Sequence, residues 1–130
     1  MSILVTGGCG FVGSALTREL LKLEENIIVF DLIIKSPVKS DSSRRVTFIQ
    51  GDVACIEDIE QAFQGQDIKA VIHVAGFGLA GTHNLPAFDA QTIKTNVDGT
   101  KNILEACFKF NVKALGNAVT ENPEKHSRNL

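Results

Sequence analysis

Four short apolar runs rich in β-branched residues recur along the first 75 residues of the chain. They are Ile3–Val5, Ile27–Phe30, Val46–Ile49 and Ala70–Val74. Short runs with apolar residues at consecutive positions are typical of strands that are buried on both faces, as in a parallel sheet. The pattern therefore predicts four buried strands, and Val112–Leu115 begins a fifth that Gly116 and Asn117 interrupt.

Helical periodicity separates these runs. On one face of a first predicted helix lie Val12, Ala15, Leu16, Leu20 and Leu23, with Arg18, Glu19 and Lys22 available to solvent. A second helix over 55–64 repeats Ile56, Ile59 and Phe63 at i, i+3 and i+7, and acidic residues in its first turns suit the helix dipole. A third, longer stripe is formed by Ile93, Val97, Thr100, Leu104 and Cys107.

The order of these segments is strand, helix, strand, loop, strand, helix, strand, loop, helix. Such an order implies parallel strands joined by right-handed crossovers, so we predict a doubly wound α/β fold. Polar residues over 34–45 and glycines over 76–91 predict two irregular connections. We expect one incomplete domain over residues 1–115, followed by a divergent, disordered tail over 116–130 that is charged and has no apolar face.

Length and composition narrow the function classes. The chain has 130 residues, 44% of them hydrophobic, which suits one globular domain. Its 13 basic and 15 acidic residues give a net charge of −2, which argues against a general nucleic-acid binder. The chain contains no tyrosine, which excludes any mechanism with a phenol as its acid or base.

The cysteines and the apolar runs indicate the compartment. Cys9, Cys55 and Cys107 are odd in number and widely spaced, and they are interpreted as reduced thiols rather than a disulfide frame or a zinc site. We see no signal peptide and no apolar run of about 20 residues that could span a membrane. The chain is expected to be soluble and cytoplasmic.

The strongest candidate site lies between the first predicted strand and the first helix. Gly7, Gly10 and Gly13 form a Gly-x-x-Gly-x-x-Gly pattern. Such a turn uses backbone conformations that only glycine adopts easily, and it lets the backbone approach a pyrophosphate at the helix N-terminus. Glycine turns also serve plain strand–helix packing, but the position of this one predicts dinucleotide binding. Cys9 within it is a reactive thiol or, more simply, a small residue that fits.

Asp31 ends the second predicted strand, 21 residues after Gly10. This is close to the spacing of about 20 expected for the carboxylate that binds the adenosine ribose hydroxyls. A carboxylate there repels a 2′-phosphate, so NAD is favoured over NADP. Two alternatives remain: Asp31 only starts a turn, or Lys35 with Arg44 and Arg45 folds back to accept a 2′-phosphate.

Two further polar residues follow or end strands. Asp52 comes after the third predicted strand, where it could take the adenine amino group or, equally, cap the second helix. His73 ends the fourth strand, and we interpret it as a core histidine because no carboxylate or cysteine lies at a useful spacing for a triad or a metal site.

Five motifs in order resemble the extended short-chain dehydrogenase/reductase family. They are Thr6–Gly13, Phe30–Asp31, Gln50–Val53, His73–Gly76 and Thr95–Cys107. Within that family they look most like the 3β-hydroxysteroid dehydrogenase-like branch, including the short-chain dehydrogenase 42E group, over residues 2 to about 115. The resemblance implies a Rossmann fold and a role for Asn96 in ordering the active site. It also implies an NAD(P) site made of Gly7, Gly10, Phe11, Val12, Asp31, Asp52 and Val53, with Ala75 and Gly76 against the ribose.

The chain departs from that family from Gly116 onward. Members carry a Ser or Thr after the fifth strand and then a Tyr-x-x-x-Lys pair, whose tyrosine exchanges the proton during hydride transfer. Because this chain has no tyrosine, we name no catalytic residue. The family activity implied is NAD(P)-dependent oxidation or reduction of a sterol or steroid, and we expect this chain, as a truncated or spliced form ending near its fifth strand, to be inactive alone.

Two other functions remain open. A broken fifth strand would leave the fourth strand as a sheet edge, so the chain could be a noncatalytic NAD(H)-sensing or partner-binding module that self-associates through that edge. It could also be an unstable product without a role. A longer form of the family could take a steroid-like substrate and associate with the endoplasmic reticulum membrane.

Overall fold

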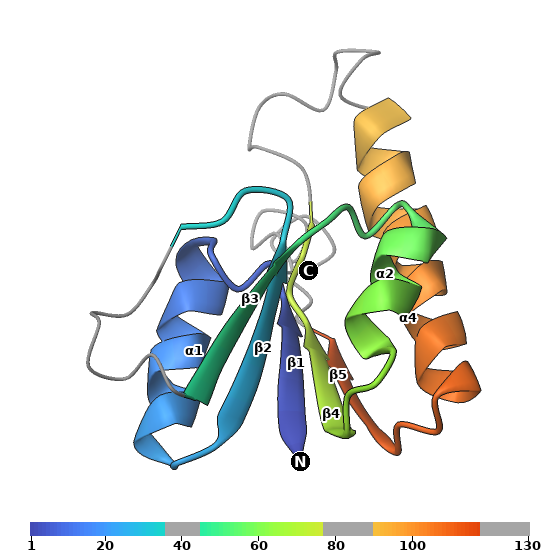
Figure 1. Cartoon of the computed structure of the whole chain (residues 1–130). Coiled ribbons are helices and arrows are strands. Elements are labelled where there is room, and N and C mark those ends of the chain that lie inside the picture. The colour runs from blue at the N-terminus through green and yellow to red at the C-terminus, as the bar shows by residue number, and fades with distance from the viewer. Residues whose placement is uncertain (36–44, 77–89, 118–130) are drawn as a thin grey trace, which may run out of the picture.

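A computed structural model describes residues 1–35, 45–76 and 90–117. The predicted connections over 34–45 and 76–91 lie mostly outside these residues, as does most of the predicted tail. Figure 1 shows a central sheet with α1 (Phe11–Lys22) on one face and α2 (Ile56–Phe63) and α4 (Gly99–Lys109) on the other. The predicted doubly wound α/β fold is confirmed.

Five parallel strands form the sheet in the order β3-β2-β1-β4-β5. Their bounds are β1 Ser2–Thr6, β2 Asn26–Asp31, β3 Val46–Gln50, β4 Ile68–His73 and β5 Ala114–Asn117. The chain starts in the middle of the sheet, builds outward to β3, then crosses back to β4. The strand order therefore reverses between β1 and β4, which is where doubly wound sheets bind ligands at the carboxyl ends of the strands.

The fifth strand differs from the sequence-based prediction. Gly116 and Asn117 do not interrupt it, because they pair in register with Ile72 and His73 of β4. β4 consequently lies inside the sheet, so the prediction that β4 forms a sheet edge is wrong. The hydrogen bonds to β4 explain why a strand forms over residues that have low intrinsic strand propensity.

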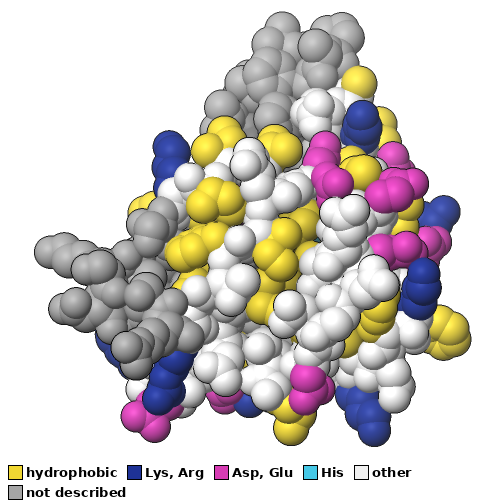
Figure 2. Space-filling view, in the orientation of Figure 1, with side chains coloured by type: hydrophobic (Ala, Val, Ile, Leu, Met, Phe, Trp, Pro, Cys, Tyr) yellow, Lys and Arg dark blue, Asp and Glu magenta, His cyan; other side chains and the backbone are white. Residues whose placement is uncertain are grey.

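Two apolar clusters fill the spaces on either side of the sheet. Val5, Ile27 and Val29 point toward α1, while Leu4, Ile28 and Phe30 alternate with them and point toward α2 and α4. This alternation buries both faces of the central strands, as the consecutive apolar runs predicted. Figure 2 shows hydrophobic side chains also reaching the surface over the strands, between the helices on either side.

The predicted packed face is confirmed for α2, is confirmed in part for α1, where Leu16 and Leu20 pack against the sheet, and differs most in the third helix. In α2, Ile59 and Phe63 are buried as expected. In α1 the fully buried residues are Gly13 and Thr17, whereas Val12 and Leu23 of the predicted face are exposed. Small residues at the inner face let α1 pack close to the strands, which a search for large apolar residues does not detect.

The third helix begins with a π-helical segment, η2 (Ile93–Asp98), that runs without a break into α4, and residues 90–92 before it are also helical. Helix therefore replaces the end of the predicted loop. Of the predicted stripe, Cys107 is buried and Thr100 is half-buried, but Ile93, Val97 and Leu104 are exposed. The buried face is instead made of Gly99, Ile103, Ala106 and Cys107. The prediction that the stripe lies on the packed face was therefore wrong for Ile93, Val97 and Leu104.

Candidate functional site

The β1–α1 turn lies at the reversal point of the sheet. Gly7 has a φ of 68°, which only glycine adopts without strain, and its N–H donates to the carbonyl of Phe30 at 2.8 Å. A Cβ at Gly7 would lie 2.8 Å from the backbone of Ala75, and one at Gly13 would overlap the Gly7 carbonyl. Glycine is therefore required at both positions by the turn and by the close approach of β4.

The N-terminus of α1 opens at this turn. Its N-cap is Gly10, no side chain caps it, and no acidic residue lies in its first turn. The backbone N–H groups of the first turn and the positive end of the dipole can thus accept an anion. The first two helical residues, Phe11 and Val12, are apolar yet exposed, Phe11 by 95%. Such residues at a polar helix start offer an apolar contact to a bound group.

Asp31 lies beside the glycine turn. Its Oδ2 accepts a hydrogen bond from the Cys9 N–H at 2.9 Å, and its Oδ1 accepts a longer one from the Ile33 N–H at 3.4 Å. The carboxylate thus fixes the loop and also serves the turn after β2, and its half-buried position leaves acceptor capacity for hydroxyl donors.

The neighbouring cysteine is not an activated thiol, because burial outweighs the opposing effect of Lys35 on its pKa. Burial raises the pKa of the Cys9 thiol, and its sulfur accepts from the Lys35 N–H at 3.2 Å. A raised pKa keeps the thiol protonated and weakly nucleophilic. The simpler interpretation of Cys9, as a small residue that fits the turn, agrees with these contacts.

The basic residues that could accept a 2′-phosphate do not all lie near Asp31. Arg45 donates to the carbonyl of Glu24 at 2.6 Å, so it lies at the amino ends of β2 and β3, opposite to Asp31. Arg44 falls outside the described residues. Lys35 lies near the glycine turn through its backbone contact to Cys9. Of the pair Arg44–Arg45, the described member is therefore turned away from the candidate site.

Asp52 and Val53 follow β3. The Asp52 carboxylate accepts from the Ala54 N–H at 2.9 Å, whereas the N-cap of α2 is Cys55 and has no side-chain cap. The alternative in which Asp52 caps α2 is therefore wrong, because it closes the turn before that helix. Val53 is buried, and a Cβ on Gly99 of α4 would lie 2.7 Å from its side chain. The Val53 side chain thus packs in the core, leaving its backbone near the strand ends.

A chain of hydrogen bonds links β1, β4 and the third helix through His73. The Thr6 hydroxyl lies 2.6 Å from His73 Nδ1, and His73 Nε2 lies 3.1 Å from the Thr100 hydroxyl. Thr100 donates its own proton to the Asn96 carbonyl at 2.6 Å, so it accepts from Nε2–H. Thr6 in turn accepts from the N–H groups of Val74 and Ala75, which leaves its proton for Nδ1.

These directions fix one protonation state. His73 is neutral with its proton on Nε2, and burial lowers its pKa in agreement with this assignment. The interpretation of His73 as a core histidine is confirmed by its burial and by these bonds. Sequence reasoning missed Thr6 and Thr100 as its partners, because hydroxyl residues 94 positions apart carry no joint signal.

Ala75, Gly76 and Asn96 meet beyond β4. Ala75 backs the Gly7 turn, and a Cβ on Gly76 would lie 3.3 Å from Asn96 Oδ1. Asn96 is half-buried in η2, so the π-helical segment brings its amide to the open end of β4. Eight of the nine predicted cofactor residues, and Asn96, thus lie around the carboxyl edge of the sheet. The ninth, Val53, has its backbone near this edge and its side chain in the core.

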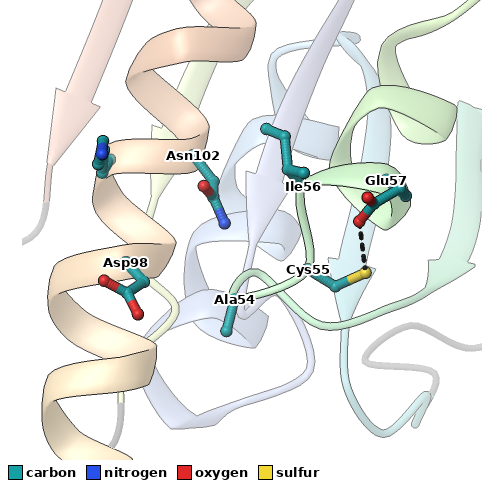
Figure 3. A pocket seen from close by; sticks show the side chains of 7 residues that line it. Ala54, Cys55, Ile56, Glu57, Asp98 and Asn102 are labelled. Atoms are coloured by element: carbon teal, nitrogen blue, oxygen red, sulfur yellow. Dashed lines mark hydrogen bonds between the residues drawn. The ribbon is translucent and has the colours of Figure 1, made fainter.

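A separate pocket opens between α2 and α4. It has a volume of about 420 Å³ and is lined by Ala54, Cys55, Ile56, Glu57, Asp98, Lys101 and Asn102. Figure 3 shows Asp98, the last residue of η2, and Asn102 of α4 facing the segment that leads into α2. Asn102 also donates to the Val53 carbonyl at 3.0 Å, so this lining residue of the pocket is bonded to the segment that follows β3. Sequence reasoning did not identify this pocket.

Within residues 1–35, 45–76 and 90–117, no group of three or more His, Cys, Asp or Glu residues could hold a metal ion. In the same described part of the chain, no helix is long and apolar enough to cross a membrane.

Comparison with known proteins identifies relatives. The model of the 3-beta hydroxysteroid dehydrogenase/isomerase family matches residues 4–120. Short-chain dehydrogenase/reductase family 42E member 1 of Bos taurus is 40% identical over 114 residues, which cover 88% of this chain and 28% of the bovine protein. The 3 beta-hydroxysteroid dehydrogenase type 7 of Rattus norvegicus is 36% identical over 121 residues, 86% of this chain and 33% of the rat protein. The chain thus spans about a third or less of these relatives.

Solved structures with the same fold include two epimerases. UDP-glucose 4-epimerase of Thermus thermophilus in complex with NAD superposes with a TM-score of 0.77 at 29% identity, over 88% of this chain and 36% of that one. The enzyme of Bifidobacterium longum in complex with NAD+ and UDP gives a TM-score of 0.79 at 27% identity, over 92% and 37%. Both likenesses cover the α/β unit described above.

Proposed function

Because the chain belongs to the 3-beta hydroxysteroid dehydrogenase/isomerase family, we propose that it binds NAD at the carboxyl ends of β1, β2 and β4. The observation that carries this proposal is the β1–α1 turn. Gly7 has a positive φ, the N-terminus of α1 is uncapped, and the first helical turn has no carboxylate. These three features together suit a pyrophosphate.

Different residues of the site would contact different parts of the dinucleotide. The turn of Gly7 and Gly10 with the exposed Phe11 and Val12 receives the pyrophosphate, and Asp31 accepts from the adenosine ribose hydroxyls. Asp52 and the Val53 backbone lie toward the adenine. Ala75 and Gly76 line the path of the second ribose, with the Asn96 amide beside Gly76. When bound, NAD supplies a hydride acceptor.

NAD fits this site better than NADP. Asp31 is the charged side chain nearest the turn whose contacts are described, and a carboxylate disfavours a 2′-phosphate at the ribose. Arg45, which could have offset that charge, is bonded at the opposite edge of the sheet. NAD is also present in solved structures that share this fold.

Cofactor binding by this chain is proposed separately from the reaction of the family. We propose that the longer family form transfers hydride between NAD and a sterol or steroid, and that this chain alone binds the cofactor without catalysis. The chain has no tyrosine to act as the proton donor. His73 does not replace it, because it is buried and both of its ring nitrogens are hydrogen-bonded.

Two measurements on the purified chain test this proposal. NADH fluorescence is expected to rise on addition of the chain, with NADPH giving a weaker response. NADH oxidation with keto-steroids is expected to equal the rate without protein. Turnover above that background would contradict the noncatalytic assignment, and equal responses to both cofactors would contradict the role of Asp31.

A further inference from the structure

The peptide that joins Val53 to Ala54 is held on both of its sides. Its carbonyl accepts a hydrogen bond from the side-chain amide of Asn102 at 3.0 Å, and its N–H donates to Asp52 Oδ1 at 2.9 Å. Figure 3 shows Asn102 reaching from α4 toward the segment that leads into α2. Because the peptide is planar, a side chain of the third helix thus fixes the group that orients the Asp52 carboxylate.

Further contacts hold the same short segment after β3. The Asp52 N–H donates to Asp58 Oδ2 at 3.0 Å, and the Asp52 carbonyl accepts from the Cys55 N–H at 2.9 Å. The Val53 side chain is buried against Gly99 of α4, where a Cβ would lie 2.7 Å from it. The backbone of Asp52 and Val53 therefore has a defined direction before any ligand binds.

Two polar groups of this segment remain available to a ligand. Within residues 1–35, 45–76 and 90–117, neither Asp52 Oδ2 nor the Val53 N–H has a hydrogen-bond partner. The first is an acceptor and the second a donor, and they belong to adjacent residues. The edge of adenine has the opposite order, with a donor amino group at C6 and an acceptor nitrogen at N1.

We propose that Asn102 is a positioning residue that gives the dinucleotide site its preference for a 6-aminopurine base. It acts through the Val53–Ala54 peptide, which keeps Asp52 Oδ2 and the Val53 N–H side by side. The inference rests on the proposed function, because it needs the adenine of NAD at this edge. Hypoxanthine has an oxygen at C6 and an N–H at N1, so an acceptor would face Asp52 and a donor would face the Val53 N–H. A site built for one hydrogen-bonding pattern rejects the other.

The third helix does not depend on Asn102 for its place on the sheet. Ile103 and Ala106 of α4 are buried in the core, and Thr100 is bonded to His73 of β4. Removal of the Asn102 amide is therefore expected to release the Val53–Ala54 peptide while the helix stays packed. The effect belongs to the base of the dinucleotide and not to the fold.

Fluorescence titration with two dinucleotides tests this role. The probes are NADH and reduced nicotinamide hypoxanthine dinucleotide, which differ only in the purine. The unmodified chain is expected to bind NADH about tenfold more tightly or better. Asn102→Leu has a similar size and no donor, and its preference is expected to fall to about threefold or less, mainly through weaker NADH binding. Asn102→Asp is a second variant without the donor and is expected to show the same narrowing.

Lys101→Leu is the matched control. Lys101 precedes Asn102 on α4 and lines the same pocket, and it forms no ion pair among the described residues. Loss of its charge acts equally on two dinucleotides of the same charge, so the ratio of the two affinities is expected to stay unchanged. Circular dichroism establishes that each variant keeps the fold.

The ratio of affinities separates positioning from a merely structural role. If both Asn102 variants bind the two dinucleotides with the preference of the unmodified chain, or if the unmodified chain has no preference, the role of Asn102 is overturned while NAD binding stands. A folded, unmodified chain that binds neither dinucleotide overturns the proposed NAD site and this inference with it.

Discussion

His73 is the residue whose environment is most fully determined. Both ring nitrogens are occupied, Nδ1 by the Thr6 hydroxyl and Nε2 by Thr100, and the directions of these bonds require the neutral ring. A second ring proton would have to displace the proton that Thr6 donates. Burial disfavours the charged form as well, so the pKa of His73 is lowered from 6.5.

The first prediction is a loss of stability in mild acid. Because the folded pKa of His73 is below its unfolded value, the unfolded chain takes up this proton first as the pH falls below 6.5. The contribution of neutral His73 is thus present above that pH and is lost as the pH falls toward the folded pKa. Chemical denaturation is expected to show a lower free energy of unfolding at about pH 5.5 than at about pH 7.5.

Substitutions assign this loss to His73. In His73→Gln the difference between the two pH values is expected to shrink, since no proton can be taken up there. His83→Gln combined with His126→Gln is the control and should keep the full difference. If His73→Gln keeps the full difference and the control loses it, the assignment of the neutral ring is wrong.

The second prediction concerns Asp31. In Asp31→Ala the ribose loses its carboxylate acceptor and the repulsion of a 2′-phosphate disappears. NADH affinity is expected to fall about tenfold or more, and the preference for NADH over NADPH is expected to narrow. Asp67→Ala removes an exposed carboxylate at the opposite edge of the sheet and is the control. Fluorescence titration measures both; an unchanged cofactor preference in Asp31→Ala would argue against ribose binding by this residue.

At the scale of elements, strands were predicted better than helices. The first four strands lie within two residues of their predicted ends, because burial on both faces leaves a continuous apolar run. The third helix was assigned the wrong face, because its packed side uses Gly99 and Ala106 and because η2 is π-helical, which changes the angular spacing of side chains. Small residues and a local change of helix type are not visible in apolar periodicity.

The third prediction tests that corrected face with two adjacent residues. Ile103 is buried, so Ile103→Ala is expected to destabilise the chain by about 2–5 kcal/mol. Leu104 is half exposed, so Leu104→Ala is expected to change the stability of the monomer by less than about 0.5 kcal/mol. Urea denaturation at low protein concentration measures both. Equal losses of stability, or a larger loss in Leu104→Ala, would contradict the corrected face and support the packed face predicted from the sequence.

At the scale of the whole molecule, the glycine turn and Asp31 could be placed from the sequence, because the strand–turn–helix order fixes where they lie. The fifth strand could not, since Gly116 and Asn117 form it only through pairing with β4. The Thr6–His73–Thr100 bonds and the pocket between α2 and α4 could not either. They depend on tertiary neighbours that are far apart in the sequence.

The central claim is that this α/β unit binds NAD at the β1–α1 turn. Calorimetric titration of the purified chain with NADH tests it most directly, with circular dichroism of the same sample to establish that the chain is folded. Saturable binding of one NADH per chain is expected, together with weaker binding of NADPH. A folded chain that releases or absorbs no heat, and whose thermal unfolding midpoint is unchanged by NADH, would contradict the claim.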